Sequence, residues 1–163
     1  MAAERAEAKA RAAAHKGRVE LIEHDPLPVV WRDDTMDRFD PRSVYVETYW
    51  LAVLGPSAIL AVRRLSDWLQ DHPSGIEIGV GDLAASLGLG HGSGRQAPII
   101  PALERLVLFG IARVQWDTYA VRRTIAPLAP RQHNCLPGYL AVRHDADVQC
   151  MQHDQATTIG LTR

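Results

Sequence analysis

Hydrophobic positions are most regular in residues 80–125, where helical spacing gives way to strand spacing. A short helix capped by Asp82 is predicted by three apolar residues on one face, Leu83, Ala84 and Leu87. A longer helix, after the glycine-rich turn HGSG, is indicated by a second apolar face of Ile99, Ile100, Leu103, Leu106 and Val107. These residues therefore predict two helices joined by a sharp turn.

A β-hairpin is predicted directly after the second helix. Gly110 ends that helix, and residues 112–116 and 119–125 alternate or run apolar around Asp117-Thr118. The pattern ALERLVLFGIARV resembles the winged helix-turn-helix family, in which a recognition-type helix runs through a glycine into the first wing strand. The resemblance implies a mainly α fold, a winged helix-turn-helix with a small β-hairpin wing.

Two further helices are predicted in residues 43–72, separated by Gly55-Pro56, because Gly ends a helix and Pro begins one. Their inward-facing residues recur at helical spacing: Tyr45, Tyr49, Trp50, Val53, Leu54, Ala58, Ile59, Val62, Leu65, Trp68 and Leu69. Residues 76–78 alternate and should pair with the hairpin as a third strand. The winged domain is thus expected to span residues 43–127.

The two ends of the chain are expected to be an arm and an extension. In residues 1–42, a charged helix over 2–16 precedes a proline-containing extended segment, which should lie on the domain or add to a sheet edge. Residues 128–163 should hold a short helix after Pro137 and a loose polar tail. The acidic residues of the arm lack the glycine and distal glutamate of a calcium loop, so a solvated loop is expected there.

Charge is unevenly distributed, although the whole chain carries a net charge of only −1. Residues 91–131 hold six Lys and Arg against two Asp and Glu, a local excess of positive charge of the kind that phosphate binding needs. The expected DNA-binding residues are Ser93, Arg95, Gln96, Arg105, Arg113, Arg122 and Arg123. Residues 93–97 would meet base edges at the start of the second helix, and the hairpin arginines would hold phosphates or enter the minor groove.

The sequence thus favours a non-catalytic protein that binds duplex DNA, as a transcriptional regulator or as a component of a nucleoprotein complex. Pro101, inside the expected recognition helix, leaves the placement of Arg95 and Gln96 open, because the helix could begin or kink there. The alternative is a protein–protein assembly module, because a fold does not fix a function. A homodimer or larger complex would then form through the arm and the first aromatic helix.

Cysteine and histidine gather in the C-terminal extension. The candidates for a metal site are His133, Cys135, Cys150 and His153, with His144 between them, but they match no standard zinc-finger spacing. Unligated side chains are therefore favoured over a zinc site, and no cofactor is expected. Two cysteines suit a reducing compartment, and the chain has no apolar run of about 20 residues, so a cytoplasmic protein without a membrane span is expected.

Overall fold

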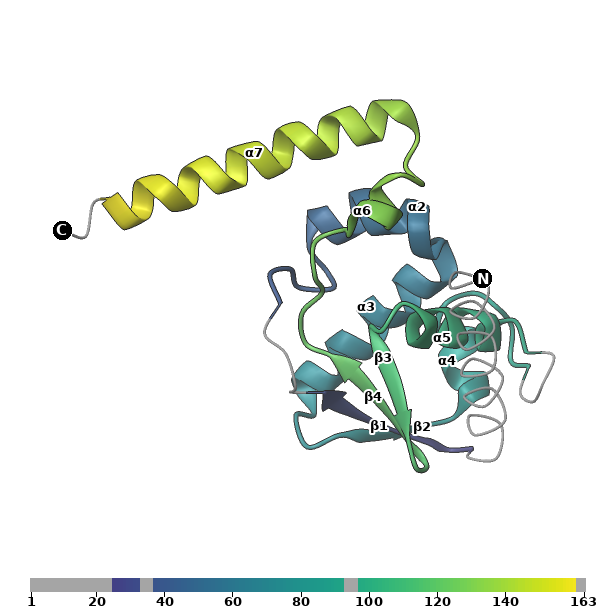
Figure 1. Cartoon of the computed structure of the whole chain (residues 1–163). Coiled ribbons are helices and arrows are strands. Elements are labelled where there is room, and N and C mark those ends of the chain that lie inside the picture. The colour runs from purple at the N-terminus through teal and green to yellow at the C-terminus, as the bar shows by residue number, and fades with distance from the viewer. Residues whose placement is uncertain (1–24, 33–36, 93–96, 161–163) are drawn as a thin grey trace, which may run out of the picture. The chain divides into compact units, whose positions relative to one another are not determined.

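The computed structural model describes residues 25–32, 37–92 and 97–160, with side chains up to Met151, and forms two compact units, Met1–Pro127 and Leu128–Arg163. In the described part of the first unit, four strands form one sheet in the order β2-β1-β4-β3 (Figure 1). The strands are β1 (Leu27–Arg32), β2 (Ile76–Ile78), β3 (Ala112–Gln115) and β4 (Thr118–Arg122). Because β1 is antiparallel to β2 and parallel to β4, the sheet is mixed.

This sheet overturns the mainly α winged helix-turn-helix that the sequence predicts, since the fold is of the α/β class. The difference comes from β1, which lies inside the sheet and not at its edge. Pro28 is tolerated there because the register with β4 begins only at Val29, so the missing N–H removes no bond to β4. The third strand forms at Ile76–Ile78 as predicted, but it pairs with β1, so its predicted pairing with the hairpin is wrong.

The helix boundary at Gly55-Pro56 is confirmed. A π-helical turn, η1 (Val46–Trp50), leads into α2 (Leu51–Leu54), and α3 (Pro56–Asp71) begins immediately after Gly55. Gly55 has a φ of +79°, which an L side chain rarely adopts. The aromatic residues expected to face inward are buried: Tyr45, Tyr49 and Trp50. They belong to the core of this unit, so they are not available as the dimer surface considered from the sequence.

The helical pair predicted in residues 80–110 is present as α4 (Val80–Ser86) and α5 (Ile99–Leu108). Gly110 follows α5 with a φ of +71°, and its N–H donates to the Val107 carbonyl, which ends the helix as predicted. Asp82 lies in the first turn of α4, whereas Gly79 occupies the N-cap position, so the predicted cap is wrong. Pro101 is the third residue of α5, where its missing N–H would have had no helical partner.

One face of the sheet packs against helices α3 and α5 (Figure 1). Tyr119 on β4 is fully buried, and its hydroxyl donates to the Leu103 carbonyl of α5 at 2.8 Å. Burial raises the pKa of the Tyr119 hydroxyl well above its ordinary value. The largest buried side chains come from the sheet, α2, α3, α4, α5 and the η1 turn: Leu27, Tyr49, Leu54, Leu65, Leu69, Leu83, Ile99, Ile100, Leu103, Leu106 and Tyr119.

The second unit contains a short helix α6 (Pro130–His133) and a long helix α7 (Gly138–Gly160). The expected loose tail is wrong, since α7 continues through residues 149–160. No Pro or Gly occurs between residues 139 and 159, so no residue breaks the helix. Among the described residues, no helix is both long and apolar enough to cross a membrane. The helix expected at residues 2–16 lies outside the described residues.

Candidate functional site

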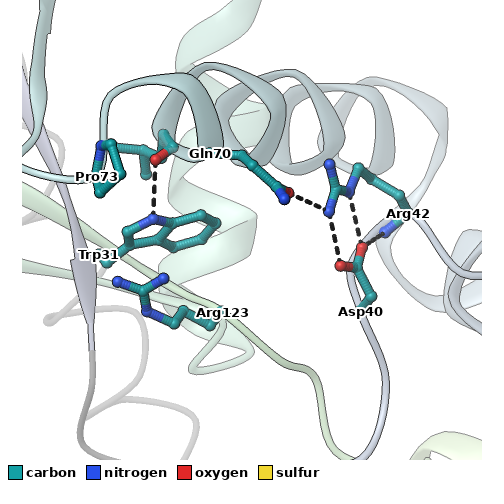
Figure 2. A pocket seen from close by; sticks show the side chains of 7 residues that line it. Trp31, Asp40, Arg42, Gln70, Pro73 and Arg123 are labelled. Carbon is teal, nitrogen blue, oxygen red and sulfur yellow. Dashed lines mark hydrogen bonds and ion pairs between the residues drawn. The ribbon is translucent and has the colours of Figure 1, made fainter.

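One end of the sheet carries a pocket of about 250 Å³ beside Trp31 (Figure 2). The indole N–H of Trp31 donates to the Leu69 carbonyl at 3.0 Å. The guanidinium of Arg123 lies over the indole ring, 4.8 Å from the ring centre. The pocket is lined by Trp31, Asp40, Arg42, Leu69, Gln70, Pro73 and Arg123.

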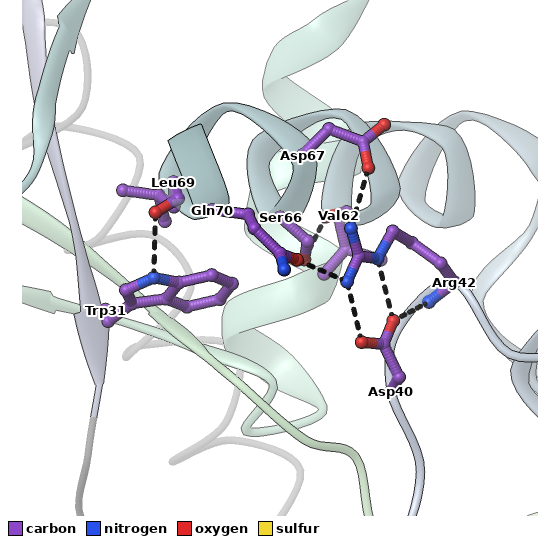
Figure 3. A network of polar contacts seen from close by, with 8 residues as sticks. All are labelled: Trp31, Asp40, Arg42, Val62, Ser66, Asp67, Leu69 and Gln70. Atoms are coloured by element: carbon purple, nitrogen blue, oxygen red, sulfur yellow. Dashed lines mark hydrogen bonds and ion pairs between the residues drawn. The ribbon is translucent and has the colours of Figure 1, made fainter. Parts of the chain in front are cut away.

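Arg42 closes the other side of this pocket with a polar network (Figure 3). Its guanidinium donates twice to Asp40, through Nε and Nη2 at 2.9 Å each. The remaining contacts go to Asp67 at 3.1 Å and to Gln70 at 2.6 Å. The hydrogen bond from Arg42 lowers the pKa of the Asp40 carboxyl, and the same bond raises the pKa of Arg42 above its ordinary value.

This pocket is better explained as part of the framework than as a ligand site. Ligand pockets usually enclose roughly 300–1,000 Å³. Here Arg42 uses all three guanidinium nitrogens on residues of its own chain. The Trp31 indole likewise makes its hydrogen bond within the fold. Arg42 and Trp31 therefore use their polar groups within the fold: Arg42 links Asp40 to α3, and Trp31 links β1 to α3.

The turn of the β3–β4 hairpin exposes a tryptophan, unlike the pocket, where Trp31 is half-buried. Its two-residue turn is Trp116-Asp117, because Gln115 pairs with Thr118, so the predicted turn at Asp117-Thr118 is one residue too late. Trp116 has a φ of +58°, an uncommon conformation for a bulky residue. Trp116 is 92% exposed. A large apolar ring in water on a strained backbone makes Trp116 a candidate interaction residue.

The arginines expected to bind DNA divide into two groups. Arg105 donates to the Val53 carbonyl at 2.9 Å and lies over the Phe109 ring. Arg122 is half-buried and forms an ion pair with Asp37. Arg113 on β3 and Arg123 after β4 are exposed, the latter against Trp31 as described above. Ser93, Arg95 and Gln96 lie outside the described residues. Three of the arginines predicted to bind DNA, Arg105, Arg122 and Arg123, therefore also contact other parts of the fold.

Among the described residues, neither Cys135 nor Cys150 belongs to a cluster that could hold a metal ion. Cys135 and Cys150 are both exposed free thiols. The Cys135 thiol lies 3.5 Å from the Arg131 carbonyl, one turn earlier in the chain. Cys150 and His153 are both on α7, but the side chain of His153 lies outside the described ones. The residues that gather around His133 are instead His144 and Asp145.

No protein-family model matches this chain, and comparisons with curated proteins and with solved structures also gave no match. Function therefore has to be argued from the residues themselves. Trp116 and Asp145 are the two residues of interest that sequence reasoning missed. Trp116 looked like the last residue of a strand, and an aspartate in a charged helix carries no signal of its own.

Proposed function

We propose that this protein is a non-catalytic duplex DNA-binding protein that uses the β3–β4 hairpin as its main contact element. The observation that supports it is that one hairpin carries both an exposed arginine, Arg113, and an exposed tryptophan, Trp116. A guanidinium suits phosphate, and an apolar side chain can wedge between base steps from the minor groove. Since β3 is the edge strand of the sheet, the hairpin has an open side for such a contact.

The expected binding is weak and only modestly sensitive to salt. Each phosphate contact contributes about 0.9 to the slope of log affinity against log salt. Arg113 and Arg123 together would therefore give a slope of about −1.8, and Arg95, which lies outside the described residues, would add a similar increment if it also contacts a phosphate. A regulator or nucleoprotein component of this kind would depend on partner subunits or on Trp116 for much of its affinity.

The test is a gel shift with random duplex DNA at a series of salt concentrations. Arg113→Ala should reduce the salt slope by about 0.9, because one phosphate contact is lost. Trp116→Ala should weaken binding at every salt concentration without changing the slope, because the indole carries no charge. Arg64→Ala, which removes an arginine of α3 outside the basic segment, is the matched control and should change neither quantity.

Two results would reject DNA binding by this surface. One is a wild-type protein that shifts no duplex at low salt, where electrostatic binding is strongest. The other is an equal loss of affinity in the Arg113 variant and the Arg64 variant, which would reflect net charge alone.

A second candidate function is assembly through the same hairpin tip. Asp117 is exposed beside Trp116, and a carboxylate at that position would repel phosphate. Tryptophan is also enriched among the residues that dominate protein–protein binding energy. The partner proposed here is a second copy of this chain. Concentration-dependent self-association that Trp116→Ala abolishes, together with no duplex binding, would favour assembly over DNA binding.

A further inference from the structure

Three metal-ligating side chains converge within the second unit: His133 at the end of α6, and His144 and Asp145 on α7. One ligand atom from each lies within 4.8 Å of the others. Asp145 Oδ1 is central, at 2.9 Å from His133 Nε2 and 3.4 Å from His144 Nδ1. The two imidazole rings lie 5.0 Å apart between centres and are tilted by 58°.

Hydrogen bonding alone does not explain this arrangement. His133 Nε2 is buried, yet it makes no well-aligned hydrogen bond among the described residues, although Asp145 Oδ1 is only 2.9 Å away. The distance is short while the direction is wrong, so the nitrogen does not point along the line to the oxygen. The contact between His144 and Asp145 is longer than an ordinary hydrogen bond. Side chains that bind one metal ion direct their ligand atoms at the ion and not at one another. Their ligand atoms can therefore lie close together without forming aligned hydrogen bonds.

We propose that His133 Nε2, His144 Nδ1 and Asp145 Oδ1 bind one divalent transition-metal ion of the zinc class. Zinc bonds of about 2.0–2.1 Å in a tetrahedron place the ligand atoms about 3.3 Å apart. The two separations from Asp145 Oδ1, 2.9 and 3.4 Å, are close to that value, and the two imidazole nitrogens lie within 4.8 Å of each other, so a small side-chain adjustment would complete the tetrahedron. Two imidazoles and one carboxylate favour zinc, cobalt or nickel over calcium and magnesium, which prefer oxygen ligands.

Burial at the site fits three protein ligands and a fourth position open to water. His144 is 6% exposed. The side chain of His133 is 25% exposed and that of Asp145 is 61% exposed, so solvent reaches the cluster from the carboxylate side. The ion would link the end of α6 to α7 across the turn at residues 134–137. This ligand set differs from the cysteine-containing set considered from the sequence, because both thiols are exposed and neither is in the cluster.

The experiment uses the full chain, stripped of metal by a chelator and titrated with zinc and with cobalt. We expect one ion per chain, a higher melting temperature with zinc, and a cobalt spectrum typical of tetrahedral coordination. Asp145→Asn and His133→Ala should each weaken zinc binding by more than about tenfold, since losing even a supporting partner of a ligand has that effect.

Two controls test whether these three side chains, and not their neighbours in the second unit, hold the ion. Asp147→Asn removes a carboxylate from the same helix and should leave zinc affinity unchanged. The double variant Cys135→Ser, Cys150→Ser should also bind zinc normally, because the thiols are not ligands. Far-ultraviolet circular dichroism of each metal-free variant checks that it remains as helical as the wild type.

Three results would overturn the proposal. The first is no saturable zinc or cobalt binding to wild-type protein at micromolar concentration, which would leave three neighbouring side chains without an ion. The second is undiminished binding in the well-folded His133 or Asp145 variant. The third is loss of binding in the cysteine double variant, which would assign the ion to the thiols instead.

Discussion

Trp31 and Trp116 lie in the same unit, Trp31 on β1 and Trp116 in the turn that leads into β4, the strand with which β1 pairs. Their surroundings are nevertheless opposite. Trp31 is half-buried, its N–H donates to the Leu69 carbonyl, and the Arg123 guanidinium lies over its ring. Trp116 is 92% exposed and lies on a turn residue with a positive φ. An aromatic residue whose polar and apolar surfaces are both satisfied within the fold serves stability. One that is left in water at a conformational cost is better explained by a partner.

The largest predicted effect is the loss of stability when Trp31 is replaced, compared with the same change at Trp116. Trp31→Ala removes a half-buried ring together with its hydrogen bond to α3, and fully buried Trp→Ala changes cost about 3–5 kcal/mol, so a loss of about 2 kcal/mol is expected. Trp116→Ala should change the free energy of unfolding by less than about 0.5 kcal/mol, as surface substitutions usually do. Urea unfolding of both variants measures the two values. Equal losses would contradict the division into a framework tryptophan and a contact tryptophan.

A smaller loss of stability is expected when the hairpin loses its hydrogen bond to α5. This change tests which part of the hairpin is held against the helices. Tyr119→Phe keeps the ring but removes the buried hydrogen bond to Leu103, so a loss of about 1 kcal/mol is expected. The neighbouring Thr118→Ala, next to the turn, should have less effect because its hydroxyl donates to the exposed carboxylate of Asp117. Urea unfolding again provides the measurement. If Thr118→Ala proves the more damaging change, the turn and not the base of the hairpin is the anchored part.

The smallest effect concerns Asp40, which lines the same pocket as Trp31. Asp40→Asn should lower stability by less than about 1 kcal/mol at neutral pH, because the ion pair with Arg42 is about half exposed. The pKa of Asp40 is lowered in the folded state, so its contribution is present above roughly pH 4 and lost as the pH falls through that lowered value. Unfolding measured at pH 7 and pH 3 should show a gap that narrows in acid. Glu77→Gln, a charge change on β2, serves as the control, and a gap that persists in acid would exclude the ion pair as its cause.

The sequence predicts the features that depend on neighbouring residues and misses those that depend on contacts between distant segments. Helices α3 and α5 and the β3–β4 hairpin follow from local periodicity, and the helix stops at Gly55 and Gly110 follow from backbone freedom. The position of β1 could not be predicted, because pairing between distant segments leaves no local pattern. The charge excess of residues 91–131 was visible, but the ion pair of Arg122 with Asp37 depends on where β1 leads the chain.

Two residues of the candidate sites, Trp116 and Asp145, could not be predicted, and the reasons are again physical. A shift of one residue in the predicted turn concealed Trp116, because it made a turn residue into a strand residue. Asp145 was missed because ten residues of loop and helix separate His133 from His144, and the turn between α6 and α7 decides which side chains meet. The sequence shows histidines and both cysteines in this segment and favours unligated side chains, whereas the structure groups His133 with His144 and Asp145.

The insertion of β1 between β2 and β4 also constrains the order of folding. Val29 pairs with Tyr119, so the centre of the sheet joins segments that are synthesised far apart in time. On the ribosome, β1 and β2 can pair early as an antiparallel strand pair, while the parallel contact must wait until β4 emerges. Contacts of such long sequence separation require costly loop closure and slow the folding of a domain. A nascent chain that ends before residue 118 would therefore expose one edge of β1 to other chains, a natural point of engagement for a chaperone.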